Sequence, residues 1–126
     1  MTPAVHVQVT LPLRLPSLAN QRLHHMARHR LLDGHKGTAF AAVRVLGRGL
    51  KPPLTISLTR IGPRRLDPDN LAGSFKGVQD GVALALGVDD GDERVTWSYG
   101  QRRATAGEPR TVRGYGVVIE IRKGVG

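Results

Sequence analysis

The chain has 126 residues and a net charge of +9, with 19 lysines and arginines against 10 aspartates and glutamates. Hydrophobic residues make up 40% of it, enough for the core of one domain, and their periodic spacing argues against intrinsic disorder. The sequence contains neither a run of about 20 apolar residues, which a membrane span needs, nor the pattern of a secretory signal. It has no cysteine, which excludes disulfides and thiolate metal sites and is typical of a cytoplasmic protein.

The charges are arranged in three blocks. Residues 1–66 contain 11 basic residues and one acid, and residues 94–126 contain seven basic residues and two acids. Residues 67–93 reverse this balance, with seven acids and one lysine. Basic blocks suit a partner rich in phosphates, but an acidic block adds nothing to phosphate binding. The acidic block therefore needs an explanation of its own.

The first half of the chain predicts two strands and one short helix. Apolar and polar residues alternate over residues 5–11 and again over 54–59, as in strands with one buried face. Residues 17–36 are rich in histidine and arginine and lack a clean period, so we expect a basic loop with room for one helical turn. Thr38 is a suitable N-cap for a helix over residues 39–46.

The second half predicts a longer helix and two more strands. An apolar stripe with helical spacing predicts a helix over residues 71–86, with Gly87 after its last residue: Leu71, Phe75, Val78, Val82 and Leu86. Residues 95–99 and 115–121 alternate as strands, and 104–112 have the composition of a flexible turn. The order of elements predicts an α+β fold for residues 1–126: a single small domain with a mixed sheet of about four strands and two helices on one face.

Asp67 and Asp69 form the first acidic group. Pro68 disfavours helical backbone at Asp67, and in an extended chain residues i and i+2 point the same way. The two carboxylates can then converge, and oxygen ligands of this kind suit Mg²⁺, Mn²⁺ or Ca²⁺. The alternative is purely structural, with one aspartate as an N-cap and Pro68 as the first helical residue.

The second acidic group follows the longer helix and contains Asp89, Asp90, Asp92 and Glu93. Alone, such a sequence is typical of a solvated turn. A helix over 71–86 is about 24 Å long, so its two ends cannot share one metal ion. This group must fold back toward the helix start if Asp90 or Asp92 is to join the first one.

Three sets of cations are candidates for phosphate contacts. Lys76 lies on nearly the same helical face as Asp69, although an exposed ion pair with Asp80 is the simpler interpretation. Arg64 and Arg65 directly precede the first acidic group, and Arg22, Arg28 and Arg30 lie in the basic segment, beside several histidines. We expect both arginine sets to contact phosphates.

The string RRLDPDNL at residues 64–71, followed by an amphipathic helix and Val88-Asp89-Asp90, resembles the RusA family of Holliday junction resolvases. Leu11-Pro12, Pro16-Ser17 and Asn20 also resemble the opening strand and turn of that family, so the similarity covers roughly residues 5–122. It implies a small α+β homodimer that binds branched DNA and resolves four-way junctions in recombination and repair by paired, Mg²⁺-dependent hydrolysis, with Mn²⁺ as a substitute metal.

The resemblance also implies the site residues. Asp67, Asp69 and Asp90 match the family's metal ligands, and counting back from Val95 makes Asp92 a substitute for Asp90. A helical lysine assists in that family, but its usual position is Gly73 here and Lys76 lies one turn later. Two other functions stay open: a basic protein that binds nucleic acid without cleaving it, and a nuclease for other branched DNA.

Overall fold

In a computed structural model, which describes residues 5–16 and 25–124, the chain forms four strands and three helices. The strands are β1 (Val5–Leu11), β2 (Leu54–Ile61), β3 (Val95–Arg102) and β4 (Gly116–Lys123). The helices are α1 (His25–Leu46), α2 (Pro68–Ser74) and α3 (Lys76–Leu86). The expected single α+β domain with a four-stranded sheet is confirmed.

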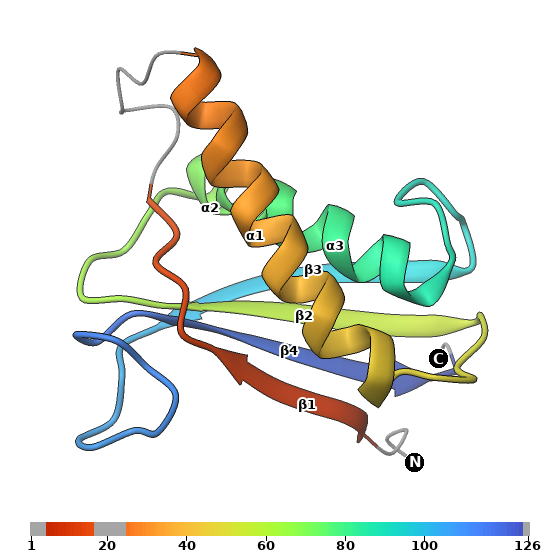
Figure 1. The fold of residues 1–126 in the computed structure, drawn as a ribbon. Helices are drawn as coiled ribbons and strands as arrows, with labels where there is room; N and C mark the ends of the chain where they lie inside the picture. Colours follow the sequence, from red (N-terminus) through yellow and green to blue (C-terminus); the bar gives the residue numbers. More distant parts are fainter. Residues whose placement is uncertain (1–4, 17–24, 125–126) are drawn as a thin grey trace.

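The sheet is mixed, with the strand order β1-β4-β2-β3. β4 pairs antiparallel with both β1 and β2, whereas β2 and β3 run parallel. The α2–α3 connection between the parallel strands lies with α1 over one face of the sheet (Figure 1). The core fills the space between the helices and this face, where Leu54, Ile56 and Leu58 of β2 are fully buried.

The first helix is longer than the sequence predicts. α1 begins at His25, so the expectation of a basic loop over 17–36 is wrong from residue 25 onward, while residues 17–24 lie outside the described part. Its buried stripe is short and made of small or polar residues: His35, Ala39 and Val43. Such a stripe has little apolar signal, which is why periodicity missed it.

α1 can bury so small a stripe because α3 presents glycines to it. A Cβ atom at Gly77 would lie 2.6 Å from the backbone oxygen of Leu32, and one at Gly81 would lie 3.0 Å from Cβ of Ala39. The two helix backbones therefore approach closely. Contact between backbones supplies the packing that large side chains provide elsewhere.

The helix expected over 71–86 is present as two helices. Phe75 separates them with φ −88° and ψ 0°, and α2 starts at Pro68, three residues before the expected beginning. The predicted stripe holds across the break, since Leu71, Phe75, Val78 and Val82 are all buried. Gly87 ends α3 in the left-handed conformation, with φ 70°, as its position predicts. No helix of the described residues is long and apolar enough to span a membrane.

Candidate functional site

Two loops meet at one end of the sheet. Ile61 at the end of β2 aligns with Arg102 at the end of β3 and with Gly116 at the start of β4. The loops 62–67 and 103–115 therefore leave the sheet together, and we name them the arginine end (Figure 1). They contain five arginines and two acids: Arg64, Arg65, Arg103, Arg110, Arg113, Asp67 and Glu108.

A side chain of β3 fixes the chain just before Asp67. The Gln101 side chain accepts a hydrogen bond from the backbone N–H of Leu66 at 2.9 Å and donates one to its carbonyl oxygen at 2.8 Å. This pair of bonds holds Leu66 as a neighbouring strand would. The position of Asp67 is thereby tied to the sheet, and no local sequence pattern indicates this contact.

Asp67 is the N-cap of α2. Its backbone is extended, its Oδ1 accepts from the backbone N–H of Asn70 at 2.9 Å, and its Oδ2 accepts from Nδ2 of Asn70 at 3.0 Å. Pro68 is in the first turn of the helix. The structural alternative from the sequence is thus confirmed for Asp67, which is nonetheless exposed to solvent.

Asp69 lies in the first turn of α2 and is also exposed. The expectation of extended backbone through both aspartates is wrong at Asp69, because the fixed φ of proline suits the first helical position as well as an extended chain. The two carboxylates still stand at the start of one helix. A carboxylate has about four lone-pair sites, and the Asn70 bonds use two of those on Asp67.

The acidic turn, residues 87–94, lies at the other end of α3, before β3 begins (Figure 1). Asp90 is exposed there, and the structure does not bring it to Asp67 and Asp69. Within residues 5–16 and 25–124, no three histidine, aspartate or glutamate side chains form a group that could hold a metal ion. One chain therefore offers Asp67 at the arginine end and Asp69 beside it in the first turn of α2, and not the three carboxylates that the family resemblance implies.

Asp92, the substitute for Asp90, is already engaged. It accepts hydrogen bonds from Nε and Nη2 of Arg94, at 3.1 and 2.8 Å, and from the backbone N–H of that residue at 2.9 Å. These bonds from Arg94 lower the pKa of Asp92 to about 2. Asp92 thus stabilises its own turn.

Lys76 is the first residue of α3, and its Nζ lies 3.5 Å from a carboxylate oxygen of Asp80. Both side chains are substantially exposed, so this is the surface ion pair that the spacing allowed. Arg28 and Arg30 are exposed near the start of α1, and Arg22 lies outside the described residues. Arg64 and Arg65 are exposed in loop 62–67, next to Asp67.

A pocket of about 200 Å³ opens at the arginine end, and sequence analysis missed several of its residues. Its lining is formed by Arg60, Gly62, Pro63, Arg64, Arg65, Gln101, Arg102 and Arg103. The direction of Arg60 was readable from the alternation of β2, since it follows Leu54, Ile56 and Leu58 on the buried face. Arg102 ends β3 and Arg103 follows it. They reach this pocket because β3 pairs with β2, a pairing that sequence periodicity does not reveal.

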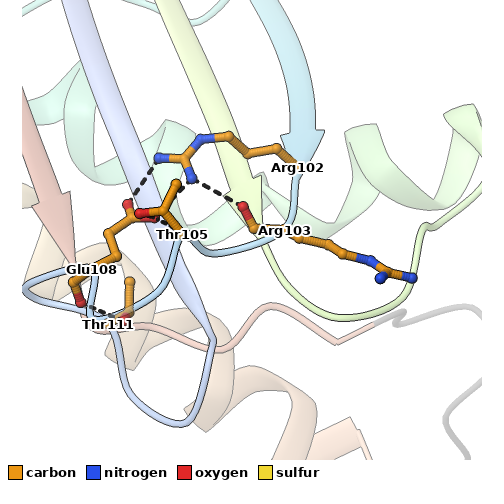
Figure 2. Close-up of polar contacts among 5 residues, drawn as sticks. All are labelled: Arg102, Arg103, Thr105, Glu108 and Thr111. Atoms are coloured by element: carbon orange, nitrogen blue, oxygen red, sulfur yellow. Dashed lines mark hydrogen bonds and ion pairs between the residues drawn. The ribbon is translucent and has the colours of Figure 1, made fainter.

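Glu108 organises the loop 103–115. Its carboxylate accepts from both terminal nitrogens of Arg102, at 2.8 Å each, and from the backbone N–H of Thr105 at 3.0 Å. These bonds lower the pKa of Glu108 to about 2, with the Arg102 guanidinium as the main cause. Figure 2 shows that the neighbouring Arg103 side chain extends away from this cluster. No carboxylate of a described residue pairs with Arg64, Arg65 or Arg103.

Neither a scan against protein-family models nor a search of curated proteins finds a match to this chain.

Proposed function

We propose that the protein is a Mg²⁺-dependent endodeoxyribonuclease that resolves four-way DNA junctions in recombination and repair. The observation that carries the proposal is the arginine end, where Asp67 and Asp69 stand beside arginines that no described carboxylate neutralises. Exposed carboxylates next to unpaired cations suit a metal ion and a phosphate at adjacent positions. The resemblance of residues 64–71 to the RusA family supports the same function.

Mg²⁺ fits the two carboxylates, because it commonly binds through one or two carboxylates and keeps several waters. When bound, it supplies Lewis-acid activation of a water and of a phosphate oxygen. The reaction is hydrolysis: water oxygen bonds to phosphorus, the bond to the 3′ oxygen breaks, and the products are a 5′-phosphate and a 3′-hydroxyl. Arg64 and Arg65 hold the phosphodiester, and Lys76 neutralises charge on its oxygens once a phosphate replaces Asp80 as its partner.

Asp90 can take part only through a second copy of the chain. The α2–α3 connection separates it from Asp67 within one chain, whereas a symmetric dimer can place the acidic turn of one protomer against the arginine end of the other. We therefore propose a homodimer in which each metal site receives Asp67 and Asp69 from one protomer and Asp90 from its partner. Such a dimer would present two sites to the two like strands of a junction.

The direct test is nicking of a synthetic four-way junction with Mg²⁺, with Mn²⁺ and with a chelator. We expect paired nicks with either metal and none with the chelator. Asp67→Asn and Asp69→Asn should bind the junction as well as the wild type or more tightly, without cutting it. Asn is as good an N-cap as Asp, so the fold survives the first change. Asp33→Asn, which removes an exposed charge from α1, is the matched control and should cut normally.

Retained Mg²⁺-dependent cutting by both aspartate variants would contradict the site. A second function, DNA binding without cleavage, is favoured by the use of both Asp67 oxygens in the helix cap. Tight junction binding with no nicks in either metal would support it. Flaps and replication forks in the same assay test whether another branched DNA is the preferred substrate.

A further inference from the structure

Arg60 is a buried cation without an anionic partner. Only 5% of its surface is exposed, whereas every other arginine that the structure describes is half-buried or exposed. Its Nε donates to the carbonyl oxygen of Leu15 and its Nη1 to that of Arg64, each at 2.8 Å. Both partners are neutral, and no carboxylate of a described residue lies within ion-pair distance. Burying a charge without a counter-charge is costly, so the position calls for an anion from elsewhere.

Gly62 keeps the guanidinium group of Arg60 in place. A Cβ atom at Gly62 would lie 2.8 Å from Nη1 of Arg60 and 3.0 Å from its Cζ and Nη2. The guanidinium plane therefore lies directly against the backbone of Gly62. That backbone is itself fixed, since the N–H of Gly62 donates to the carbonyl oxygen of Arg102 at 3.0 Å. Any larger residue at position 62 would have to displace the arginine.

Arg60 contributes to the pocket at the arginine end, together with four other arginines. Arg102 is committed to Glu108, whereas Arg64, Arg65 and Arg103 are exposed and face no described carboxylate. A cavity needs only about 15 Å³ to hold one water, so about 200 Å³ accommodates a group of several heavy atoms. A guanidinium group binds phosphate through paired hydrogen bonds, and the oxygens of one phosphate can accept from several arginines that line the same pocket.

We propose that this pocket is a phosphate-binding site, with Arg60 as its buried anchor and the exposed Arg64, Arg65 and Arg103 at its rim. The inference deepens the proposed function and rests on it only for the identity of the ligand, a phosphate of the DNA substrate. The phosphate comes either from the continuous backbone or from the end of a strand. Phosphate binding itself requires neither Asp67 nor a metal ion, so it can be measured separately from cleavage.

The first experiment titrates the full chain with inorganic phosphate in the presence of a chelator, at ionic strength held constant with chloride. The backbone amide signals of Gly62 and Arg64 are followed by NMR, with Gly91 of the acidic turn as an internal reference. We expect saturable shifts at Gly62 and Arg64 and none at Gly91. Absence of saturable shifts at Gly62, or equal shifts at Gly91, would overturn the proposal.

Variants then assign the anchor. Arg60→Met should weaken phosphate binding more than tenfold, and Arg103→Gln several-fold. Gly62→Ala retains every arginine but displaces Arg60, so it should match Arg60→Met while folding is verified by circular dichroism. Arg48→Met removes an exposed arginine from the turn that follows α1 and is the charge-matched control. Equal losses in Arg48→Met and Arg103→Gln would show diffuse attraction to a basic surface and overturn the site.

The last measurement distinguishes the two sources of phosphate and separates the pocket from catalysis. Oligonucleotides with a 5′-hydroxyl or a 5′-phosphate are bound in the chelator. Tighter binding of the 5′-phosphate, lost in Arg103→Gln, identifies a strand end, and equal binding that Arg103→Gln weakens identifies the continuous backbone. Equal binding of both that Arg103→Gln leaves unchanged would contradict a DNA phosphate in this pocket. Asp67→Asn should bind inorganic phosphate and both oligonucleotides as the wild type does. The phosphate site can therefore be confirmed or rejected even if the protein proves not to be a nuclease.

Discussion

The two ends of the sheet have opposite charge and use their carboxylates differently. The arginine end carries five arginines and two acids, whereas the acidic turn at residues 87–94 carries four acids and one arginine. At the arginine end, Asp67 caps α2 through Asn70, and Glu108 holds the loop 103–115 to Arg102 of β3. In the acidic turn, the carboxylate of Asp92 accepts hydrogen bonds from Arg94, two residues along the chain.

This difference shows why the net charge of +9 is a poor guide to function. A polyanion is attracted to the arginine end and repelled from the acidic turn, so in the proposed function DNA would meet the arginine end. Among the described residues, Asp89, Asp90 and Glu93 of the acidic turn form no ion pair. In the proposed dimer, the positively charged end of a second protomer would lie against them.

The largest expected effect tests whether the two ends work together. Asp67→Asn and Asp90→Asn should each reduce junction cleavage about a thousandfold, since activation by a metal is worth several kcal/mol. Mixing the two inactive variants should restore part of the activity. In a mixed dimer of the proposed kind, one site receives two altered residues and the other receives none. Cleavage rates of the mixture against each variant alone give the result.

Two outcomes of these cleavage assays would contradict the proposal that the arginine end of one protomer and the acidic turn of its partner act together. If Asp90→Asn cuts normally, the acidic turn has no part in the reaction. If Asp90→Asn is inactive and the mixture is inactive too, all three aspartates act within one chain, contrary to the separation seen here. Gel filtration of the mixture verifies that subunits have exchanged.

The next effect concerns affinity for DNA. Arg64→Gln with Arg65→Gln should weaken junction binding by about 10- to 100-fold at low salt. The slope of log affinity against log salt should become shallower by about 1.8, because about 0.9 is lost per phosphate contact. Arg48→Gln with Lys51→Gln removes equal charge from the opposite end of the sheet and is the control. Similar losses in both pairs would show that DNA does not distinguish the two ends.

The sequence predicted the parts of this molecule that depend on neighbouring residues. The alternation of Leu54, Ile56 and Leu58 located β2. The start of α2 matches the structural alternative, in which Asp67 caps a helix that begins at Pro68, and not the expected start at Leu71. α1 was largely missed, because its buried stripe of His35, Ala39 and Val43 is recognisable only beside the glycines of α3. Tertiary packing decided that element, and local propensity did not.

The candidate site likewise contains residues that neighbouring sequence predicts and residues that only tertiary contacts bring in. Asp67, Asp69, Arg64 and Arg65 are consecutive enough for the sequence to place them together. The contacts of Gln101 with Leu66 and the buried position of Arg60 depend on residues 35 and 45 positions apart. The separation of Asp90 from Asp67 follows from the parallel pairing of β2 and β3, which one sequence does not reveal.

The third prediction tests the close packing of α1 against α3, the helix that separates the two ends. Gly81→Ala should destabilise the fold by about 2 kcal/mol, because its Cβ would collide with the α1 backbone and force the helices apart. Gly73→Ala, on a part of α2 where a Cβ meets no atom within 4 Å, is the control and should leave stability unchanged or slightly higher. Urea unfolding monitored by circular dichroism measures both. Equal stability of the two variants would mean that α1 and α3 are not in close contact.

A smaller, pH-dependent effect arises at His35 in the same helix contact. This side chain is 5% exposed, its Nδ1 has no hydrogen-bond partner among the described residues, and burial lowers its pKa. The fold therefore favours neutral His35, so stability should be complete above about pH 6.5 and decline as pH falls below it. Urea midpoints at pH 7.5 and 5 should differ for the wild type and less for His35→Leu. Exposed His29→Leu should retain the full difference.

The smallest effect distinguishes the structural roles of two carboxylates whose pKa values are alike. Glu108 and Asp92 both have a pKa of about 2, lowered mainly by an arginine, and each accepts a backbone N–H, from Thr105 and Arg94 respectively. Any stabilisation from either is present above its ordinary pKa and is lost as pH falls toward 2. Because Glu108 joins β3 to a loop, Glu108→Gln should shift amide signals throughout residues 103–111. Asp92→Asn should shift only those of its own turn, since Asp92 and Arg94 are two residues apart. Shifts of equal reach would mean that Glu108, like Asp92, acts only within its own turn.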